Sequence, residues 1–151
     1  MRDFAAEEKR SHDEREADQL KSLNGQLGPD NQLTSLSGLR DLPVLRKSDL
    51  TQAQSENPPF GRVPVKNVGR VFQSPGPIYE PGGKGEDWWR LGRFLNAVGV
   101  CPDDLVQNTF SYHFTPAGAM FESAADAVGA TVFPAGPGQT TDQARSAAKL
   151  G

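Results

Sequence analysis

The stretch LVQNTFSYHFTPAGAMFESAADAVGATVF, residues 105–133, decides the fold that we expect for this chain. Its first part, residues 105–110, reads as a strand, and its last part, residues 130–133, reads as another. Thr115-Pro116 is expected to begin a helix between them, because threonine can cap a helix and proline at the first helical position loses no hydrogen bond. Gly129 can end that helix. Two strands joined in this way favour a parallel pair with a right-handed crossover.

The same alternation of strand and helix extends in both directions. Upstream, residues 70–73 read as a short strand, residues 74–85 as a loop, and residues 87–98 as a helix with an apolar stripe that includes Trp88. Downstream, Thr140 followed by Gln143 is a capping-box pattern for a last helix. The expected fold class is therefore α/β, with an open, mostly parallel sheet and crossover helices.

The first part of the chain has a different character. Residues 3–24 are dense in charges of both signs, which predicts a solvated helix that docks at its ends or frays. Ser35 and Ser48 can each cap a short helix further on. We therefore expect a mainly helical, partly extended N-terminal region before the sheet. Residues 1–33 are expected to form a charged helix and linker, and residues 34–151 the domain that follows.

Composition narrows the classes of function. The formal charge of −3 argues against a nucleic-acid partner, which usually requires a basic patch. No apolar run reaches the roughly 18 residues of a membrane span, and the N-terminus lacks the apolar core of a signal peptide. Cys101 is the only cysteine, which excludes an intrachain disulfide and a cysteine-based zinc site. We expect a cytoplasmic protein without a membrane partner, and assign no metal ligand.

Ligands of open α/β sheets bind beyond the carboxyl ends of the strands, so the loops there carry the candidate site. In loop 74–86, glycine N–H groups, a hydroxyl and a lysine could contact a phosphate. The candidates for this role are Ser74, Gly76, Gly82, Gly83 and Lys84. The loop matches neither GxxxxGK[ST] nor GxGxxG, and its prolines remove N–H donors. A rigid surface loop without a ligand is the alternative.

The segment SYHFTPAG, residues 111–118, is the most distinctive string of the chain. It is expected at a strand end and a helix N-terminus, where it could line a substrate pocket. The candidates are Ser111, Tyr112, His113, Phe114 and Thr115. A histidine can bind an anion or transfer a proton near neutral pH. The alternative is that His113 caps the helix or packs beside Phe114. No catalytic residue is assigned.

Three strings resemble, in order and spacing, the N-terminal part of phenylacetate–coenzyme A ligase-like enzymes, which belong to the adenylate-forming superfamily. They are GLRDLPVLRKSDL (38–50), DWWRLGRFLNAVGVCPDDLVQNTFSYHFTPAG (87–118) and GATVFPAGPGQT (129–140). The resemblance implies that residues 34–151 are an incomplete N-terminal part of such a ligase domain. These enzymes use ATP and Mg²⁺ to convert a carboxylic acid to an acyl-adenylate, and then transfer the acyl group to coenzyme A.

The resemblance also implies which ligands bind, and the phosphate loop of this chain departs from the family's pattern. A small carboxylic acid and a nucleotide are the implied partners, and residues 111–116 align with an aromatic segment that shapes the acyl pocket in relatives. The family's phosphate loop, of the form SSGTTGKPT, aligns with residues 73–82, where only Ser74 and Gly76 match. The missing threonines and lysine make pyrophosphate binding by this loop doubtful.

Two hypotheses of function follow. In the first, the chain is an N-terminal fragment of an acid–coenzyme A ligase-like protein and is inactive alone. It would then need a C-terminal part in cis or trans, and an uncovered sheet edge would favour self-association. In the second, it is a non-catalytic α/β binding or interaction module with a degenerate phosphate loop. A dehydrogenase-like nucleotide-binding domain is a third option, against which the absence of GxGxxG counts.

Overall fold

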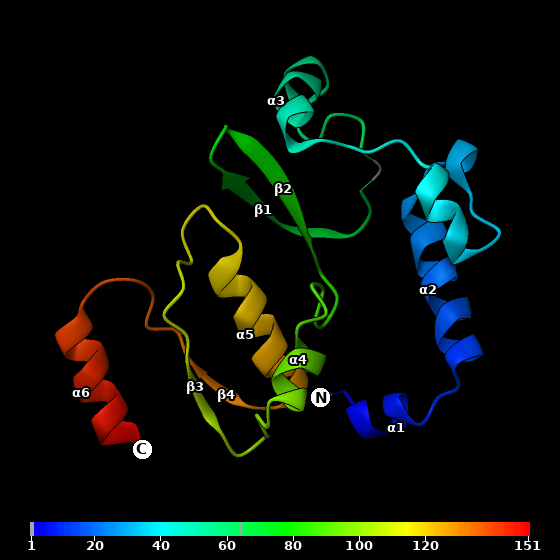
Figure 1. Cartoon of the computed structure of the whole chain (residues 1–151). Coiled ribbons are helices and arrows are strands. Elements are labelled where there is room, and N and C mark those ends of the chain that lie inside the picture. Colours follow the sequence, from blue (N-terminus) through cyan, green and yellow to red (C-terminus); the bar gives the residue numbers. More distant parts are fainter. Residues whose placement is uncertain (1, 64) are drawn as a thin grey trace. The chain divides into compact units, whose positions relative to one another are not determined.

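The computed structural model describes residues 2–63 and 65–151. The chain divides into two compact units (Figure 1). The first is Ala5–Gly83, and the second combines Lys84–Gly151 with the N-terminal residues through Phe4. The expected boundary between residues 33 and 34 refers to a longer ligase domain and stays a prediction.

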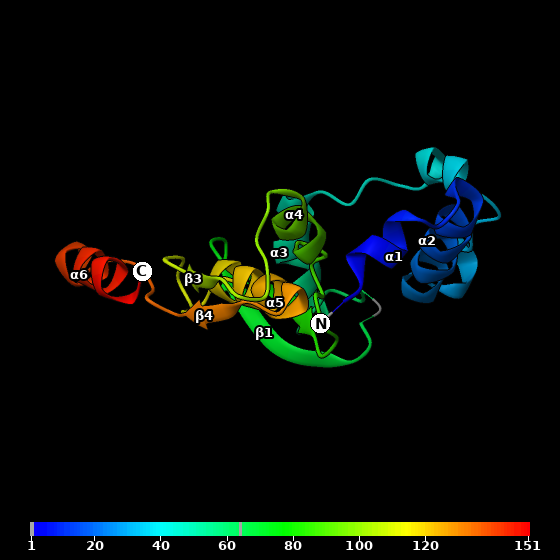
Figure 2. The same cartoon turned by 90° about the horizontal axis from the view of Figure 1, so that it is seen from below.

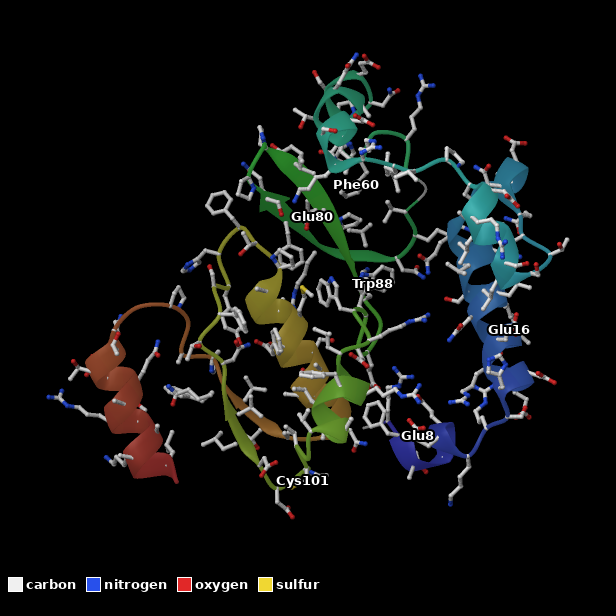
Figure 3. The ribbon with its side chains drawn as sticks, in the orientation of Figure 1. Glu8, Glu16, Phe60, Glu80, Trp88 and Cys101 are labelled. Carbon is white, nitrogen blue, oxygen red and sulfur yellow. The ribbon has the colours of Figure 1, made fainter. Side chains whose placement is uncertain are left out.

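The first unit begins with charged helices, as the sequence predicts. Helix α1 spans Phe4–Glu8 and α2 spans His12–Gln26, and no residue of α2 in the described chain is buried. Figure 3 shows the Glu16 side chain on α2. A capping box starts α2: the Glu14 N–H donates to Ser11 Oγ at 3.2 Å, and the Ser11 N–H donates to the Glu14 carboxylate at 2.9 Å. The second of these bonds, together with one from the Ser11 hydroxyl to the same carboxylate at 3.0 Å, lowers the pKa of the Glu14 carboxyl.

Three short helices follow, and the two serine caps expected for them are wrong. They are the 3₁₀ helices η1, Pro29–Asn31, and η2, Leu36–Asp41, and the α-helix α3, Lys47–Glu56. Ser35 occupies the cap position of η2, but its hydroxyl lies 2.7 Å from that of Ser37. Ser48 lies inside α3 and donates to the Asp49 carboxylate at 3.0 Å. Both hydroxyls therefore bond to neighbouring side chains and not to a helix N-terminus.

A β-hairpin completes the first unit, and it corrects the expectation of a loop over residues 74–85. Strand β1, Val68–Ser74, pairs antiparallel with β2, Ile78–Gly83. Only three residues, Pro75-Gly76-Pro77, separate the strands, and so short a connection allows only an antiparallel pair. Gly76 has a φ of +143°, and a Cβ there would lie 3.0 Å from Ile78 Cγ1. The turn therefore requires glycine at its centre.

Helix α3 is attached to the hairpin by one buried amide. Gln54 is 7% exposed. Its Nε2 donates to the Tyr79 carbonyl at 2.8 Å, and its Oε1 accepts from the Tyr79 N–H at 2.8 Å. These two bonds satisfy the outward-facing backbone groups of Tyr79, so at this point the side chain takes the place of a further strand on β2.

The second unit contains the parallel pair that the sequence predicts. Strand β3, Leu105–Gln107, pairs in parallel with β4, Thr131–Phe133, so that Val106 lies opposite Val132. Helix α5, Ala117–Val128, connects them and packs against β4 and against α4, Gly92–Ala97 (Figures 1 and 2). The mixed α/β class and the helical N-terminal region are thus confirmed, although the strands of the described residues form two separate pairs, of which β1–β2 is antiparallel and β3–β4 parallel.

The core of the second unit is built largely from small side chains of α5. Its buried members are Phe4, Leu95, Ala124, Ala125, Ala127, Val128 and Ala130. Gly92 belongs to the same packing, because a Cβ there would lie 3.0 Å from both Phe4 Cζ and Ala127 Cβ. Small residues let α4 and the N-terminal segment approach α5 closely.

The first residues of the chain are bound to this core. The Arg2 N–H donates to the Ala127 carbonyl at 2.8 Å, one of the carbonyls left without a partner at the C-terminus of α5. The Arg2 guanidinium forms an ion pair with Asp87 at 3.2 Å and lies 5.5 Å from the centre of the Phe4 ring. The Phe4 side chain is only 5% exposed. The charged segment over residues 3–24 thus docks at its first residues, which is one of the two expectations for its ends.

Helix α4 is shorter than predicted, and this places Trp88 outside the core. The backbone turns at Asp87, which has a φ of +48° and accepts the Gly92 N–H at 2.9 Å. The helix consequently begins at Gly92, and the Trp88 side chain is 39% exposed (Figure 3). Of the expected stripe, Leu95 is buried, whereas Phe94 is 54% exposed.

Two further predicted caps are also replaced. Pro116, without a side-chain hydrogen bond, holds the cap position of α5 instead of Thr115. Helix α6, Thr140–Leu150, has Thr140 as its first residue and not as its cap, because Gln139 precedes it in the left-handed conformation without a side-chain cap. Gln143 does not form a capping box, because its amide donates to carbonyls of the preceding loop. Across residues 2–63 and 65–151, no helix is long and apolar enough to cross a membrane.

Candidate functional site

The phosphate candidates of the hairpin lie in two places. Ser74 and Gly76 lie at the turn, whereas Gly82 pairs with Arg70 and Gly83 with Val68. Arg70 is four positions from Ser74, which corresponds to roughly 13 Å at about 3.3 Å per strand residue. The structure therefore separates the two pairs along the hairpin, and Lys84, an exposed residue, belongs to the other unit.

The turn of the hairpin has few groups that can bind an anion. Pro75 and Pro77 have no N–H, so Gly76 alone of the three turn residues has one. Ser74 is only 8% exposed. Phosphate-binding loops usually direct several N–H groups at one anion. The basic side chain of Lys47 is paired with Glu80 of β2 at 3.4 Å (Figure 3 labels Glu80).

The pocket candidates, in contrast, form one compact turn between β3 and α5. The His113 N–H donates to Ser111 Oγ at 3.1 Å, and the Thr115 N–H donates to the His113 carbonyl at 2.7 Å. The Gly118 N–H donates to the Ser111 carbonyl at 2.9 Å, which joins the turn to the first residues of α5. The structure thus brings Ser111, Tyr112, His113, Phe114 and Thr115 together.

Asn108, which sequence reasoning missed, lies at the centre of this segment. Its side chain is buried, and its residue is only 4% exposed. Its Nδ2 donates to Tyr112 Oη and to the Gly118 carbonyl, both at 2.8 Å. Its Oδ1 accepts from the Phe110 N–H at 3.2 Å. The signal in the sequence was a polar side chain directly after the short strand Leu105–Gln107.

The backbone of Asn108 joins the same segment to the loop after β4. Its N–H donates to the Phe133 carbonyl at 2.9 Å, and its carbonyl accepts from the Gly136 N–H at 3.0 Å. Gln143 of α6 holds the other side of this loop, because its Nε2 donates to the carbonyls of Gly136 at 2.6 Å and Gly138 at 2.7 Å. Both strand-end loops of the parallel pair are therefore joined through Asn108.

Tyr112 is held as a neutral phenol. Burial, followed by a hydrogen bond with the nearby Glu122 carboxylate, raises the pKa of Tyr112 to about 12. Its oxygen also accepts the bond from Asn108. With its pKa raised and its oxygen bonded to Asn108, Tyr112 can contribute an aromatic surface more readily than a proton.

Exposed aromatic rings surround this turn. Phe110 is 48% exposed and is stacked on Phe121, with ring centres 4.7 Å apart and planes 9° from parallel. Phe114 is 72% exposed and has a φ of +60°, and His113 is exposed beside it. Such a surface can contact an apolar group, while the histidine can meet a charged one.

In the described part of the chain, no three or more histidine, cysteine, aspartate or glutamate side chains are grouped so that they could hold a metal ion. Cys101 is exposed and precedes β3 (Figure 3), and its N–H donates to the Asp104 carboxylate at 2.8 Å.

Comparison with known proteins gives one related sequence family and matching folds. No family model matches the chain. It is 33% identical over 119 residues to phenylacetate–coenzyme A ligase of Escherichia coli (strain K12), a match that covers 73% of this chain and 26% of that protein.

Solved structures of 2-hydroxyisobutyryl-CoA ligase have the same fold. The structure in the postadenylation state with 2-HIB-AMP has a TM-score of 0.65 at 23% identity, and covers 91% of this chain and 29% of that one. The structure with 2-HIB-AMP and CoA in the thioesterification state has a TM-score of 0.64, also at 23% identity, with coverages of 91% and 30%. This chain therefore spans less than a third of the length of each relative. Together, the sequence match and the shared fold show that the chain is related to the phenylacetate–coenzyme A ligase-like enzymes of the adenylate-forming superfamily over a limited portion of their length, as expected for their N-terminal part.

Proposed function

We propose that this chain supplies the acid-binding segment of a protein that converts a carboxylic acid and ATP to an acyl-adenylate and then to a coenzyme A thioester. One observation carries this proposal: the aromatic segment 111–118 is held at the carboxyl end of β3, in a chain related by sequence to phenylacetate–coenzyme A ligase. ATP with Mg²⁺ and coenzyme A would be the co-substrates. Their use would place the protein in the cytoplasm.

The residues of segment 111–115 would each have a different role in binding the acid. Tyr112 and Phe114 would line the apolar part of the pocket, and His113 could meet a carboxylate. Ser111 and Thr115 would shape the turn that presents them. A pocket that excludes water would strengthen the electrostatic interactions with the reacting groups.

The hairpin of such an enzyme would bind phosphate weakly. Ser74 and Gly76 could approach a phosphate at the turn, whereas Gly82, Gly83 and Lys84 would need a different ligand geometry to take part. A single N–H in the turn and the absence of a lysine there favour weak phosphate binding. We therefore propose that this chain alone is inactive and works with a further part of the ligase, in cis or in trans, with self-association through its uncovered strand edges.

A second function is favoured by the same hairpin. If its turn does not bind phosphate, the chain could serve as a non-catalytic α/β module that binds a small carboxylate or another protein. The aromatic segment 111–118 would then be retained for binding and not for catalysis.

Two chimaeras with the Escherichia coli enzyme discriminate between these functions. In the first, residues 87–140 of this chain replace the matched segment of the enzyme. In the second, residues 68–83 are exchanged as well. Acid-dependent ATP–pyrophosphate exchange is measured for both. We expect activity in the first and much weaker activity in the second, because only the second has the altered phosphate turn. A first chimaera that is folded but inactive with every acid would favour the non-catalytic module.

A further inference from the structure

Both N–H groups of the Asn108 side chain donate hydrogen bonds within the protein. A primary amide has two N–H groups, and here one is bonded to Tyr112 Oη and the other to the Gly118 carbonyl. The oxygen of the same amide accepts from the backbone of Phe110. The three partners lie before, within and after the turn of residues 111–115, so a single buried group holds the two sides of this turn together.

The packing around Gly118 leaves the turn little freedom to move. A Cβ at this position would lie 2.7 Å from the Ser111 carbonyl oxygen and 2.9 Å from two atoms of the Tyr112 ring. The carbonyl of this same glycine is a partner of Asn108. Close packing and directed hydrogen bonds therefore act on the same few atoms, which determines where the tip of the turn lies.

We propose that Asn108 is the positioning residue of the acid-binding segment. In this arrangement, His113 and Phe114 face the ligand, and the Tyr112 ring forms one wall of the pocket. This inference rests on the proposed function. The side chains of His113 and Phe114 are exposed at the tip, whereas the hydroxyl of Tyr112 accepts the hydrogen bond from Asn108. Through its backbone, Asn108 also ties the tip to Gly136, so the two loops should move together.

Asn108→Asp tests this role because it preserves the shape of the side chain and removes both donors. An aspartate would also place its carboxylate beside the Gly118 carbonyl, where no proton joins them. Asn96→Asp is the matched control: it makes the same chemical change at an exposed residue of α4. Amide hydrogen exchange is measured along the intact 151-residue chain.

We expect exchange to become about tenfold faster, or more, within residues 109–118 and 134–138 in Asn108→Asp, since each lost bond is worth about that factor. Exchange at Ala124–Val128 should stay near the level of the control. Unchanged exchange in the two loops would overturn the proposal. An equal increase throughout residues 84–151 would also overturn it, because it would indicate a general loss of stability. If Asn108→Asp does not fold, Tyr112→Phe is used instead, because it removes one of the bonds and should give the same local increase in exchange more weakly. Unchanged exchange in the two loops of Tyr112→Phe would likewise overturn the proposal.

Binding of phenylacetate, measured by calorimetry, separates this inference from the function on which it rests. If the unchanged chain binds phenylacetate, Asn108→Asp should lower the affinity by about tenfold, and Phe114→Ala should lower it without changing exchange in residues 134–138. If affinity is unaffected by Asn108→Asp, the positioning role is refuted. If the unchanged chain binds no phenylacetate while exchange responds locally, the positioning of the turn is supported and the proposed acid-binding function is not.

Discussion

Phe4→Ala should destabilise the second unit strongly, although Phe4 lies at the start of a highly charged segment. Its ring is 5% exposed and packs in the core with Leu95, Ala124 and Val128. Removing a buried phenylalanine ring costs about 3–5 kcal/mol through lost burial and the cavity that remains. The Arg2 guanidinium, 5.5 Å from the ring centre, would lose a further contact of about 0.5–1 kcal/mol. We expect a loss of about 4 kcal/mol in the free energy of unfolding.

This loss is large relative to the total stability of a small unit, which is about 5–15 kcal/mol. Both tryptophans, Trp88 and Trp89, lie in the second unit. Their fluorescence during urea unfolding therefore reports on this unit separately from the first. The midpoint of unfolding should fall markedly while the slope stays the same, since the surface exposed on unfolding changes little.

Phe94→Ala is the matched control, because it removes the same side chain from the same unit at a site that is 54% exposed. Its cost should be within about 1 kcal/mol. If Phe4→Ala cost no more than Phe94→Ala, the N-terminal residues would not be part of the core. Deletion of residues 2–4 provides a second check, since it also removes the Arg2 bonds to Ala127 and Asp87. A deletion without effect on the tryptophan transition would refute the same reasoning.

Three further predictions concern other contacts. Leu95→Ala should cost roughly 2–4 kcal/mol in the same assay, because this side chain is 8% exposed in the core; a cost near zero would mean that α4 does not present it to α5. Gln54→Ala should lower the free energy of unfolding by roughly 1–3 kcal/mol and promote strand-mediated association, because both Tyr79 backbone groups lose their partner. Circular dichroism measures the loss of stability, and sedimentation measures the association. Gln52→Ala, at an exposed site of α3, is the control and should change neither quantity. Tyr112 should contribute stability that is fully present below pH 10 and is lost as the pH rises toward about 12, since its folded-state pKa is raised above the ordinary value of 10.0. In unfolding experiments at alkaline pH, Tyr112→Phe should remove the loss of stability that this group causes. An unchanged dependence of stability on pH would contradict the assigned pKa.

The pattern of the sequence determined the unit around α5. Apolar residues at strand spacing over residues 105–107 and 131–133, with an apolar helix between them and Gly129 at its end, leave few arrangements other than a parallel pair with a crossover. Strings at the same positions carried the family resemblance. Both inferences succeeded because the information is local and periodic, so that few distant contacts are needed to interpret it.

Turns and caps were less predictable, because several weak local preferences compete at each position. Residues 78–83 contain a proline and two glycines and were expected to form a loop, yet pairing with β1 makes them a strand. Ser35, Ser48, Thr115 and Thr140 are all good capping residues, and none of them provides a side-chain cap in the structure. A hydrogen bond to another nearby group is worth about as much as a cap, so the surrounding structure decides which one forms.

The candidate site shows the same division between local pattern and tertiary contact. Its five residues from Ser111 to Thr115 were identifiable because they form a distinctive polar and aromatic string at a strand end. The residue that holds them, Asn108, was not, since a single asparagine in a sequence does not reveal which groups its amide will meet. The role of Phe4 in the core was not identified for a related reason: its partners lie more than eighty positions away, and only the folded chain brings an isolated apolar ring among charged residues to the alanines of α5. The sequence by itself determined which elements form in the second unit and which family they resemble. Only the tertiary structure decided which polar and apolar side chains hold them together, because those contacts depend on distances across the fold and not on spacing along the chain.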